Sequence, residues 1–384
     1  MYLLMCAPAP VSDHGGQLKL DTKFVDGMHV QVREWNGPVR CVLQRTKHAI
    51  PFGQVYDVAD LSFELTILDQ LAPLPDAVLA DVSAVMLSAD MVDIGPLSDQ
   101  VRRAKLPFVV TIEYTLATRL RILWLENWRN PLRLLRSAIW TLNQERAVRS
   151  ALRAADGVQF NGYPAHDAYA SMNANTLLYL DNRMTPDLFA TSAEMQARAE
   201  HARQGEPLRL IYSGRLEHLK GSQDLPRLMQ ELRNKGVQAT LDIYGAGSLL
   251  DQLRASFAPF KDMIRIHAPV DFASELVPIN RQQADIFVSC HRQEDPSCSY
   301  LEAMGCGLAV AGYANQMWNR LQHSSGGGGV APIGNIAALA EVIAGWDKDR
   351  DALIAASEAG LDFARKHSFN QEFKKRMDHV RFVT

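Results

Sequence analysis

Cysteine is scarce in this chain, and its spacing excludes two kinds of site. The 384 residues include five cysteines, at Cys6, Cys41, Cys290, Cys298 and Cys306. No two of them form a CxxC pair and no histidine stands at metal-ligand spacing, so the sequence indicates neither a zinc site nor a disulfide framework. We therefore expect no bound metal and a reducing, cytoplasmic compartment.

Long apolar runs and an excess of one charge are also missing. No stretch approaches the roughly 18 consecutive apolar residues of a membrane-spanning helix, and the short apolar opening lacks the basic residues of a secretory signal. The formal net charge is -3, so no overall positive field would hold nucleic acid. We expect a chain that neither spans a membrane nor binds nucleic acid.

Short apolar runs alternate with helical segments along a chain whose length predicts more than one domain. The runs are 2–7, 39–44, 84–88, 108–112, 157–161 and 176–180, and then 208–213, 239–245, 263–268, 284–290 and 308–313. Parallel strands need crossover connections, which this alternation supplies. The sequence therefore predicts two α/β sheets.

A polar stretch rich in Ala, Glu, Arg and Gln, at about 191–206, separates the two halves. We expect a first domain over 1–190 and a second over 207–367. A C-terminal helix over 368–384 would return to the first domain. Within the second domain, the spacing of apolar residues predicts an amphipathic helix that Gly236 ends; these residues are Leu225, Leu228, Met229 and Leu232.

Two cations follow the first strand of the second domain. Arg215 and Lys220 stand in the segment GRLEHLKG, directly after the strand at 208–213. Ligands bind beyond the carboxyl ends of the strands in doubly wound sheets, and two cations there suit a diphosphate. A solvated basic loop is the alternative.

Gly245 and Gly247 form a turn after the next strand, leading into a helix predicted at Ser248. Unpaired backbone N–H groups in such a turn can receive an anion or a ligand hydroxyl. Leu250 occupies the place of the third glycine of a nicotinamide fingerprint, which disfavours a dehydrogenase. A plain tight turn is the alternative.

A polar loop then separates a strand from a helix in ADIFVSCHRQEDPSCSYLEAMGCGLAV. The strand ends at Cys290, the loop carries Glu294, and Pro296, favoured in a first helical turn, is predicted to begin a helix that Gly305 and Gly307 close.

Glu302 would then lie inside this helix, while Glu294 lies just outside it. The amides would take phosphates and the carboxylates would accept hydrogen bonds from sugar hydroxyls. The alternative is a pair of ordinary helix-end acids. The amides between the two acids belong to Ser297, Cys298 and Ser299.

Together these pieces resemble the retaining, nucleotide-sugar-dependent glycosyltransferases of family 4. GRLEHLKG, DIYGAGSL, the Glu294-x7-Glu302 element with LEAMGCGLAVAGY, and GGGGVAPIGNIAALAEVI occur in the family's order. The resemblance implies a GT-B fold, in which two doubly wound, Rossmann-like domains face each other across a cleft. The first domain would bind the acceptor and the second the nucleotide sugar.

The resemblance also implies roles for single residues. Arg215 and Lys220 would bind the donor diphosphate, with the amides of the 297–299 segment. Glu302 would hold the ribose, on the nucleoside side with the turn at Gly245 and Gly247. Glu294 would contact the donor sugar, although Asp295, Pro296 and Ser297 replace the glycine and aromatic residues that usually follow it.

In the first domain the resemblance is weaker. Gly15 and Gly16 are similar to the family's glycine loop near the donor phosphates, where absent side chains permit close approach; an ordinary turn is the alternative. Many members carry a histidine after the fourth strand. Here Glu113 follows 108–112, and we take it as the candidate catalytic substitute, against the alternative of a surface acid.

Residues 118–153 hold eight arginines against two glutamates, together with Trp124, Trp128 and Trp140. Arginine and tryptophan on an amphipathic segment suit an anionic membrane surface. A helical pair packed into the first domain, with a solvated basic face, is the alternative.

We thus expect transfer of a hexose, with retention of configuration, from a UDP- or GDP-linked sugar to the hydroxyl of a glycan or lipid-linked acceptor. Cations and helix amides would stabilise the departing diphosphate without metal or cofactor. The enzyme would be cytoplasmic, peripheral on the inner face of the membrane. A sugar-nucleotide epimerase and a catalytically silent nucleotide-sugar-binding partner are the alternatives.

Overall fold

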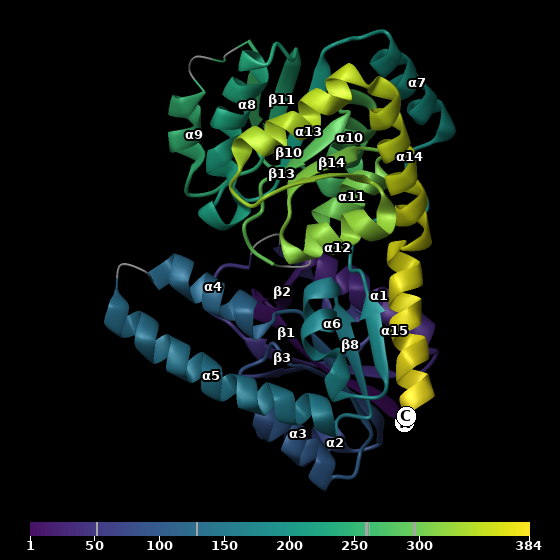
Figure 1. The fold of residues 1–384 in the computed structure, drawn as a ribbon. Coiled ribbons are helices and arrows are strands. Elements are labelled where there is room, and N and C mark those ends of the chain that lie inside the picture. The colour runs from purple at the N-terminus through teal and green to yellow at the C-terminus, as the bar shows by residue number, and fades with distance from the viewer. Residues whose placement is uncertain (51–52, 128–129, 258–259, 261, 295–296) are drawn as a thin grey trace. The chain divides into compact units, whose positions relative to one another are not determined.

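The chain divides into two units, both drawn in Figure 1. The computed structural model describes residues 1–50, 53–127, 130–257, 260, 262–294 and 297–384. The N-terminal unit comprises Met1–Asp181 and Asn370–Thr384, and the C-terminal unit comprises Asn182–Phe369. The last segment of the chain therefore packs with the first unit, far from its neighbours in sequence.

Within the described residues, seven parallel strands form the main sheet of the N-terminal unit. Their spatial order is β5 (Glu64–Leu68), β3 (Val39–Arg45), β1 (Tyr2–His14), β6 (Val82–Ser88), β7 (Phe108–Ile112), β8 (Gly157–Asn161) and β9 (Thr176–Tyr179). The chain builds outward from β1 in one direction and then from β6 in the other. This reversal is the topological switch point of a doubly wound sheet.

An antiparallel extension, β2 (Gln17–Asp21) and β4 (Gly53–Tyr56), follows the far end of β1. Gly15 and Gly16 form the two-residue turn between β1 and β2, with φ values of 63° and 94°. Positive φ at both central positions favours glycine and matches the twist of the hairpin.

Helices cover both faces of this sheet. They are α1 (Thr22–Trp35), α2 (Asp76–Leu79), α3 (Ile94–Arg103), α4 (Leu116–Asn127), α5 (Pro131–Ala154), α6 (Tyr163–Tyr169) and α15 (Phe369–Val383). Met377 and Val380 of α15 are fully buried in the core that also contains Leu3, Met28 and Val109. The C-terminal helix is thus a structural part of the first unit.

In the described part of the C-terminal unit, six parallel strands form the sheet. Their spatial order is β12 (Ile264–His267), β11 (Ala239–Tyr244), β10 (Leu208–Ser213), β13 (Ile286–Ser289), β14 (Ala309–Tyr313) and β15 (Gly328–Ala331). In chain order this is 3-2-1-4-5-6, the Rossmann arrangement, so the switch point lies between β10 and β13.

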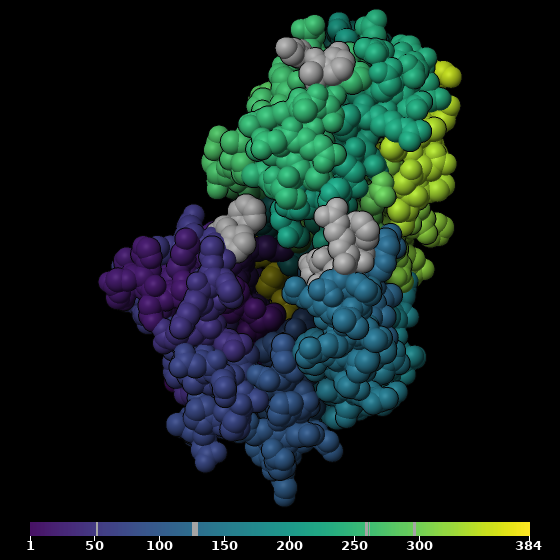
Figure 2. All heavy atoms as spheres, turned by 90° about the vertical axis from the view of Figure 1, so that its left-hand side faces the viewer, coloured from purple at the N-terminus to yellow at the C-terminus, as the bar shows by residue number. Residues whose placement is uncertain are grey.

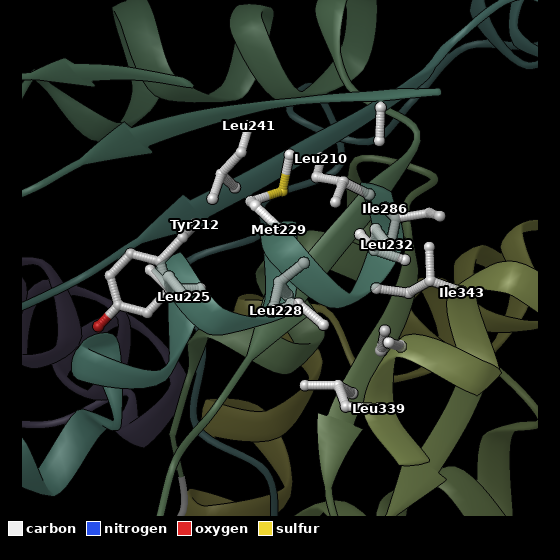
Figure 3. Packing of buried hydrophobic residues seen from close by; sticks show 14 of the residues in the cluster. Leu210, Tyr212, Leu225, Leu228, Met229, Leu232, Leu241, Ile286, Leu339 and Ile343 are labelled. Atoms are coloured by element: carbon white, nitrogen blue, oxygen red, sulfur yellow. The ribbon is translucent and has the colours of Figure 1, made fainter. Parts of the chain in front are cut away.

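The helices of this unit are α7 (Ser192–Arg203), α8 (Leu225–Asn234), α9 (Leu250–Ser256), α10 (Val277–Gln283), α11 (Ser299–Gly305), α12 (Gln316–Ser325), α13 (Ile336–Lys348) and α14 (Arg350–Lys366). The predicted amphipathic helix is confirmed as α8, whose four apolar residues are fully buried. Figure 3 shows them packed with Leu210, Leu241 and Ile286 of the sheet and with Leu339 and Ile343 of α13. Gly236, with φ of 77°, follows the helix as predicted.

The predicted strands agree with the structure except at the first, where the expected end at residue 7 is wrong. β1 continues to His14, and its pairing with β3 shifts register between Cys6 and Pro10. Proline cannot donate to a strand ladder, so Pro8 and Pro10 obscure the continuation. Among the described residues, no helix is long and apolar enough to cross a membrane.

Met377→Ala should lower the free energy of unfolding of the N-terminal unit by about 2 to 5 kcal/mol, because it leaves a cavity in a closed core. Phe382 is 79% exposed on the same helix, and Phe382→Ala should change stability by no more than about 0.5 kcal/mol. Hydrogen exchange measures the difference: Met377→Ala should speed exchange in β1 and leave β14 unchanged. Equal behaviour of the two variants would refute the docking of α15.

Candidate functional site

The loops that follow β10 and β13 meet at the switch point of the C-terminal unit. The Arg292 backbone N–H donates to the Leu219 carbonyl at 3.1 Å. Gly221 has φ of 68°, and a Cβ built there would lie 1.9 Å from the Cys290 carbonyl oxygen. Only glycine fits this backbone conformation and this contact. The two loops are therefore held together without an intervening side chain.

Both predicted cations lie on the loop after β10. Arg215 is exposed, while Lys220 ends a short 3-10 turn, His218–Lys220, and is 8% exposed. The loop thus exposes the Arg215 side chain to solvent and buries the Lys220 side chain within the C-terminal unit. This is the placement at a strand's carboxyl end that the sequence predicts.

The glycine turn after β11 packs on the same loop. A Cβ at Gly245 would lie 2.1 Å from the Gly214 carbonyl oxygen, and one at Gly247 would lie 2.4 Å from that of Leu216. The Gly245 backbone N–H donates to the backbone carbonyl of His267 at 3.3 Å. The expectation of an unpaired amide at Gly245 is therefore wrong. The glycines at these positions permit close approach between two backbone segments.

Helix α9 begins at Leu250, two residues after the predicted start at Ser248. Ser248 instead donates its backbone N–H to Glu217 at 2.8 Å and its hydroxyl to the same carboxylate at 2.5 Å. Partial burial opposes ionisation of Glu217, but the two Ser248 bonds and the charge of Arg215 together hold its pKa below the ordinary value. An ionised Glu217 thus joins the two loops beside Arg215, a role that the sequence analysis missed.

The segment after β13 differs from its prediction at the helix start. α11 begins at Ser299, with Cys298 as its N-cap residue; the predicted first residue, Pro296, lies outside the described residues. The hydroxyls of Ser297 and Ser299 lie 2.5 Å apart. Half-buried Glu294 accepts a hydrogen bond from the backbone N–H of Gln316, the first residue of α12. Its carboxylate is therefore positioned by α12.

Glu302 lies in the first turn of α11 and is 6% exposed. Arg183 donates to both of its carboxylate oxygens, Nε to Oε1 at 2.7 Å and Nη2 to Oε2 at 3.0 Å. The Arg183 guanidinium also stacks 3.7 Å from the ring centroid of Phe272. Glu302 is thus fixed in orientation by a residue 119 positions earlier, which the sequence analysis missed.

A second missed group ties three strand ends together. Asp224, which precedes α8, accepts hydrogen bonds from Arg292 at 2.5 Å and from the Tyr313 hydroxyl at 2.9 Å. Tyr313 is the last residue of β14 and is fully buried. The loops after β10 and β13 are therefore braced from beneath by a charged hydrogen-bond network.

The other predicted candidates lie in the N-terminal unit. Gly15 and Gly16 stand exposed at the tip of the β1–β2 hairpin. Glu113 follows β7 and accepts a hydrogen bond from Asn161 Nδ2 at 3.0 Å. Its backbone N–H donates to Asp90 at 2.9 Å. Glu113 thus lies in a polar group at the carboxyl ends of β6, β7 and β8.

This polar group changes the acidity of Glu113. Burial, followed by the negative charge of Asp90, raises the pKa of Glu113 to about 7. The hydrogen bond from Asn161 and the charge of Lys23 act in the opposite direction but do not cancel these effects. Burial also raises the pKa of Asp90. A carboxyl group that titrates near neutral pH can both donate and accept a proton.

Solved structures share the fold of this chain. Alr3699/HepE from Anabaena, in complex with UDP, matches with a TM-score of 0.67 and 12% identity over 100% of both chains. Sucrose-phosphate synthase from Thermosynechococcus elongatus matches with a TM-score of 0.66 and 14% identity over 100% of this chain and 98% of that one. WaaG, a glycosyltransferase involved in lipopolysaccharide biosynthesis, matches with a TM-score of 0.61 and 13% identity over 98% and 99%. The fold is GT-B.

This GT-B chain also matches a family model. Residues 194–361, most of the C-terminal unit, match the model described as glycosyl transferases group 1. The matched segment contains β10 to β15 and every candidate residue of that unit except Arg183. No curated protein matches the sequence significantly. The family match thus concerns the C-terminal unit, and the solved structures establish the fold.

Glu113→Gln should change how stability depends on pH. The folded chain holds a proton on Glu113 up to about pH 7, whereas an ordinary glutamate releases it near 4.5. The wild-type stabilisation that this proton confers is present below pH 4.5 and is lost as the pH rises to about 7. Relative to wild type, Glu113→Gln should therefore gain up to about 3 kcal/mol across this window, measured by urea unfolding.

The control is Asp99→Asn, which removes an acid that is 60% exposed in the same unit. An unchanged pH slope in Glu113→Gln would show that Glu113 is an ordinary surface acid.

Arg183 and Glu302 should be coupled energetically. Arg183→Met leaves a buried carboxylate without its bidentate cation and should cost about 1 to 3 kcal/mol, because such a group loses its compensating partner. Adding Glu302→Gln should recover part of this loss. A double-mutant cycle on the free energy of unfolding measures the coupling, and strictly additive effects would contradict it.

Proposed function

We propose that this chain is a retaining, family 4 glycosyltransferase that moves a hexose from a nucleoside diphosphate sugar to a hydroxyl acceptor. The observation that carries the proposal is the meeting of the loops after β10 and β13 at a Rossmann switch point, inside the segment that matches the group 1 model. Nucleotides bind at such switch points because helix starts and loop amides gather there.

The donor diphosphate would lie over the loop after β10. Exposed Arg215 would reach its oxygens, and enclosed Lys220 would add a second positive charge. The amides of the 297–299 segment, at the start of α11, would take remaining oxygens. The Anabaena protein with the same fold has been solved with UDP and with UDP-glucose, which supports a UDP-linked donor; a GDP-linked donor is the other candidate.

The remaining candidate residues would contact different parts of the donor, the ribose and the sugar. Glu302, held by Arg183, would accept hydrogen bonds from the ribose, with the turn at Gly245 and Gly247 beside it. Glu294 would contact the donor sugar. In the transition state, negative charge develops on the departing diphosphate, and preorganised cations and amides lower the barrier because they need no reorganisation. This chemistry uses the chain's own residues and calls for no metal or cofactor.

The acceptor would bind at the N-terminal unit, where Glu113 follows β7. With a pKa of about 7, its carboxyl group suits proton exchange with an acceptor hydroxyl. The Gly15–Gly16 turn would approach the donor phosphates. A glycan or lipid-linked acceptor, met by a cytoplasmic enzyme at the inner face of the membrane, fits the basic segment at 118–153.

Arg215→Ala should weaken the binding of the nucleoside diphosphate roughly tenfold or more, because a charge-assisted hydrogen bond contributes about 1.5 to 3 kcal/mol. Isothermal titration with UDP and with GDP measures the loss. Arg227→Ala is the control, since Arg227 is an exposed arginine of α8. The proposal fails if neither nucleotide binds the wild type, or if the two variants lose affinity equally.

A further inference from the structure

Helices α4 and α5 form an antiparallel pair that projects from the sheet of the N-terminal unit (Figure 1). We call its outward face the hairpin surface. Six large apolar side chains on it are between 49% and 75% exposed: Trp124, Leu132, Leu135, Ile139, Trp140 and Leu142. Figure 2 views the molecule from the side toward which this pair projects, and residues of this region face the viewer in blue. Exposed apolar surface gathered in this way marks an interaction site.

The exposed residues of α5 follow a helical pattern of their own. Leu132, Leu135, Ile139 and Leu142 are separated by three, four and three residues, which places them along one stripe of the helix. The buried residues of α5, Thr141, Glu145, Val148, Ala151 and Leu152, lie on the other side. The helix therefore carries a second apolar face beyond the one that packs on its own unit.

The arginines of the pair divide between the two faces. Arg119 and Arg149 lie within 3.6 Å and 2.6 Å of Glu145, which is 4% exposed, so they serve the internal packing. Among the described side chains of the pair, the exposed arginines are Arg121, Arg133, Arg136, Arg146 and Arg153. Among the described side chains of α4 and α5, Glu145 is the one acid, and it is buried. The hairpin surface is thus apolar and positively charged.

The positive charge of the hairpin surface favours an anionic bilayer over a second copy of the chain as its binding partner. A second copy docked stripe to stripe would set arginines against arginines, which repels. An anionic bilayer attracts the arginines, accepts the aliphatic stripe below its phosphates, and accommodates tryptophan at the interface. Arginine can extend along the apolar surface while its guanidinium stays with the headgroups.

We propose that the hairpin surface inserts the stripe Leu132, Leu135, Ile139 and Leu142 into the headgroup and acyl boundary of an anionic bilayer. The inference deepens the membrane location within the proposed function and is independent of the transfer reaction. It differs from adsorption by charge alone, because the apolar stripe supplies binding that salt does not screen.

Cosedimentation with vesicles tests the insertion. Wild-type protein should bind vesicles of phosphatidylcholine and phosphatidylglycerol at low salt, bind pure phosphatidylcholine much less, and keep a measurable part of its binding at high salt. The double variant Leu135→Ser and Ile139→Ser should lower the partition coefficient at least tenfold and abolish the salt-resistant part. Val58→Ser is the matched control, because Val58 is 54% exposed elsewhere in the same unit.

The charge contribution is separated by Arg133→Gln with Arg136→Gln, which should remove most of the salt dependence while leaving the salt-resistant part. The inference is overturned if wild type fails to bind anionic vesicles at low salt, or if Leu135→Ser with Ile139→Ser binds as wild type does. It is also overturned if sedimentation velocity shows a dimer that the same serine variant dissociates. UDP titration of the same samples shows independently whether the proposed donor function holds.

Discussion

The contact between the Gly221 backbone and the Cys290 carbonyl is the constraint on which the C-terminal unit's site depends. It brings the loop with Arg215 and Lys220 against the loop that leads to Glu294 and α11, at the one point of the sheet where the chain changes direction. Hydrogen bonds from Arg292 and Tyr313 to Asp224 brace the same loops from below. Because both loops are fixed before any ligand arrives, charges placed on them need little reorganisation during a reaction.

The two units use their strand ends in different ways. In the C-terminal unit, cations stand exposed or enclosed on a loop, and the acids are held by specific donors: Glu217 by Ser248, and Glu302 by Arg183. In the N-terminal unit, Glu113 and Asp90 lie close together, and burial keeps both pKa values high. The first environment suits an anion, and the second suits a neutral hydroxyl group that exchanges a proton. This difference fits the transfer from a diphosphate donor to a hydroxyl acceptor that we propose.

Local patterns in the sequence predicted the strands, helix α8 and the loops that carry Arg215, Lys220, Glu294 and Glu302, because apolar periodicity and turn residues are read within a few positions. Contacts between distant segments could not be read in this way. Arg183 and Glu302, which form an ion pair, are 119 positions apart. Gly245 is required because its backbone approaches the Gly214 carbonyl, 31 positions earlier. Strands β2, β4, β5 and β15 were missed because polar residues or glycines interrupt their apolar residues. The roles of the predicted site residues stay predictions.

The central claim is that a nucleoside diphosphate sits over the loops after β10 and β13. Hydrogen exchange of the whole chain, with and without saturating UDP or GDP, tests it most directly, because a bound ligand slows the opening of the segments that it contacts. The account predicts slower exchange in 214–221 and 297–302, with β9 and α15 unchanged. Binding that leaves both segments unprotected, or that protects only the N-terminal unit, would contradict it.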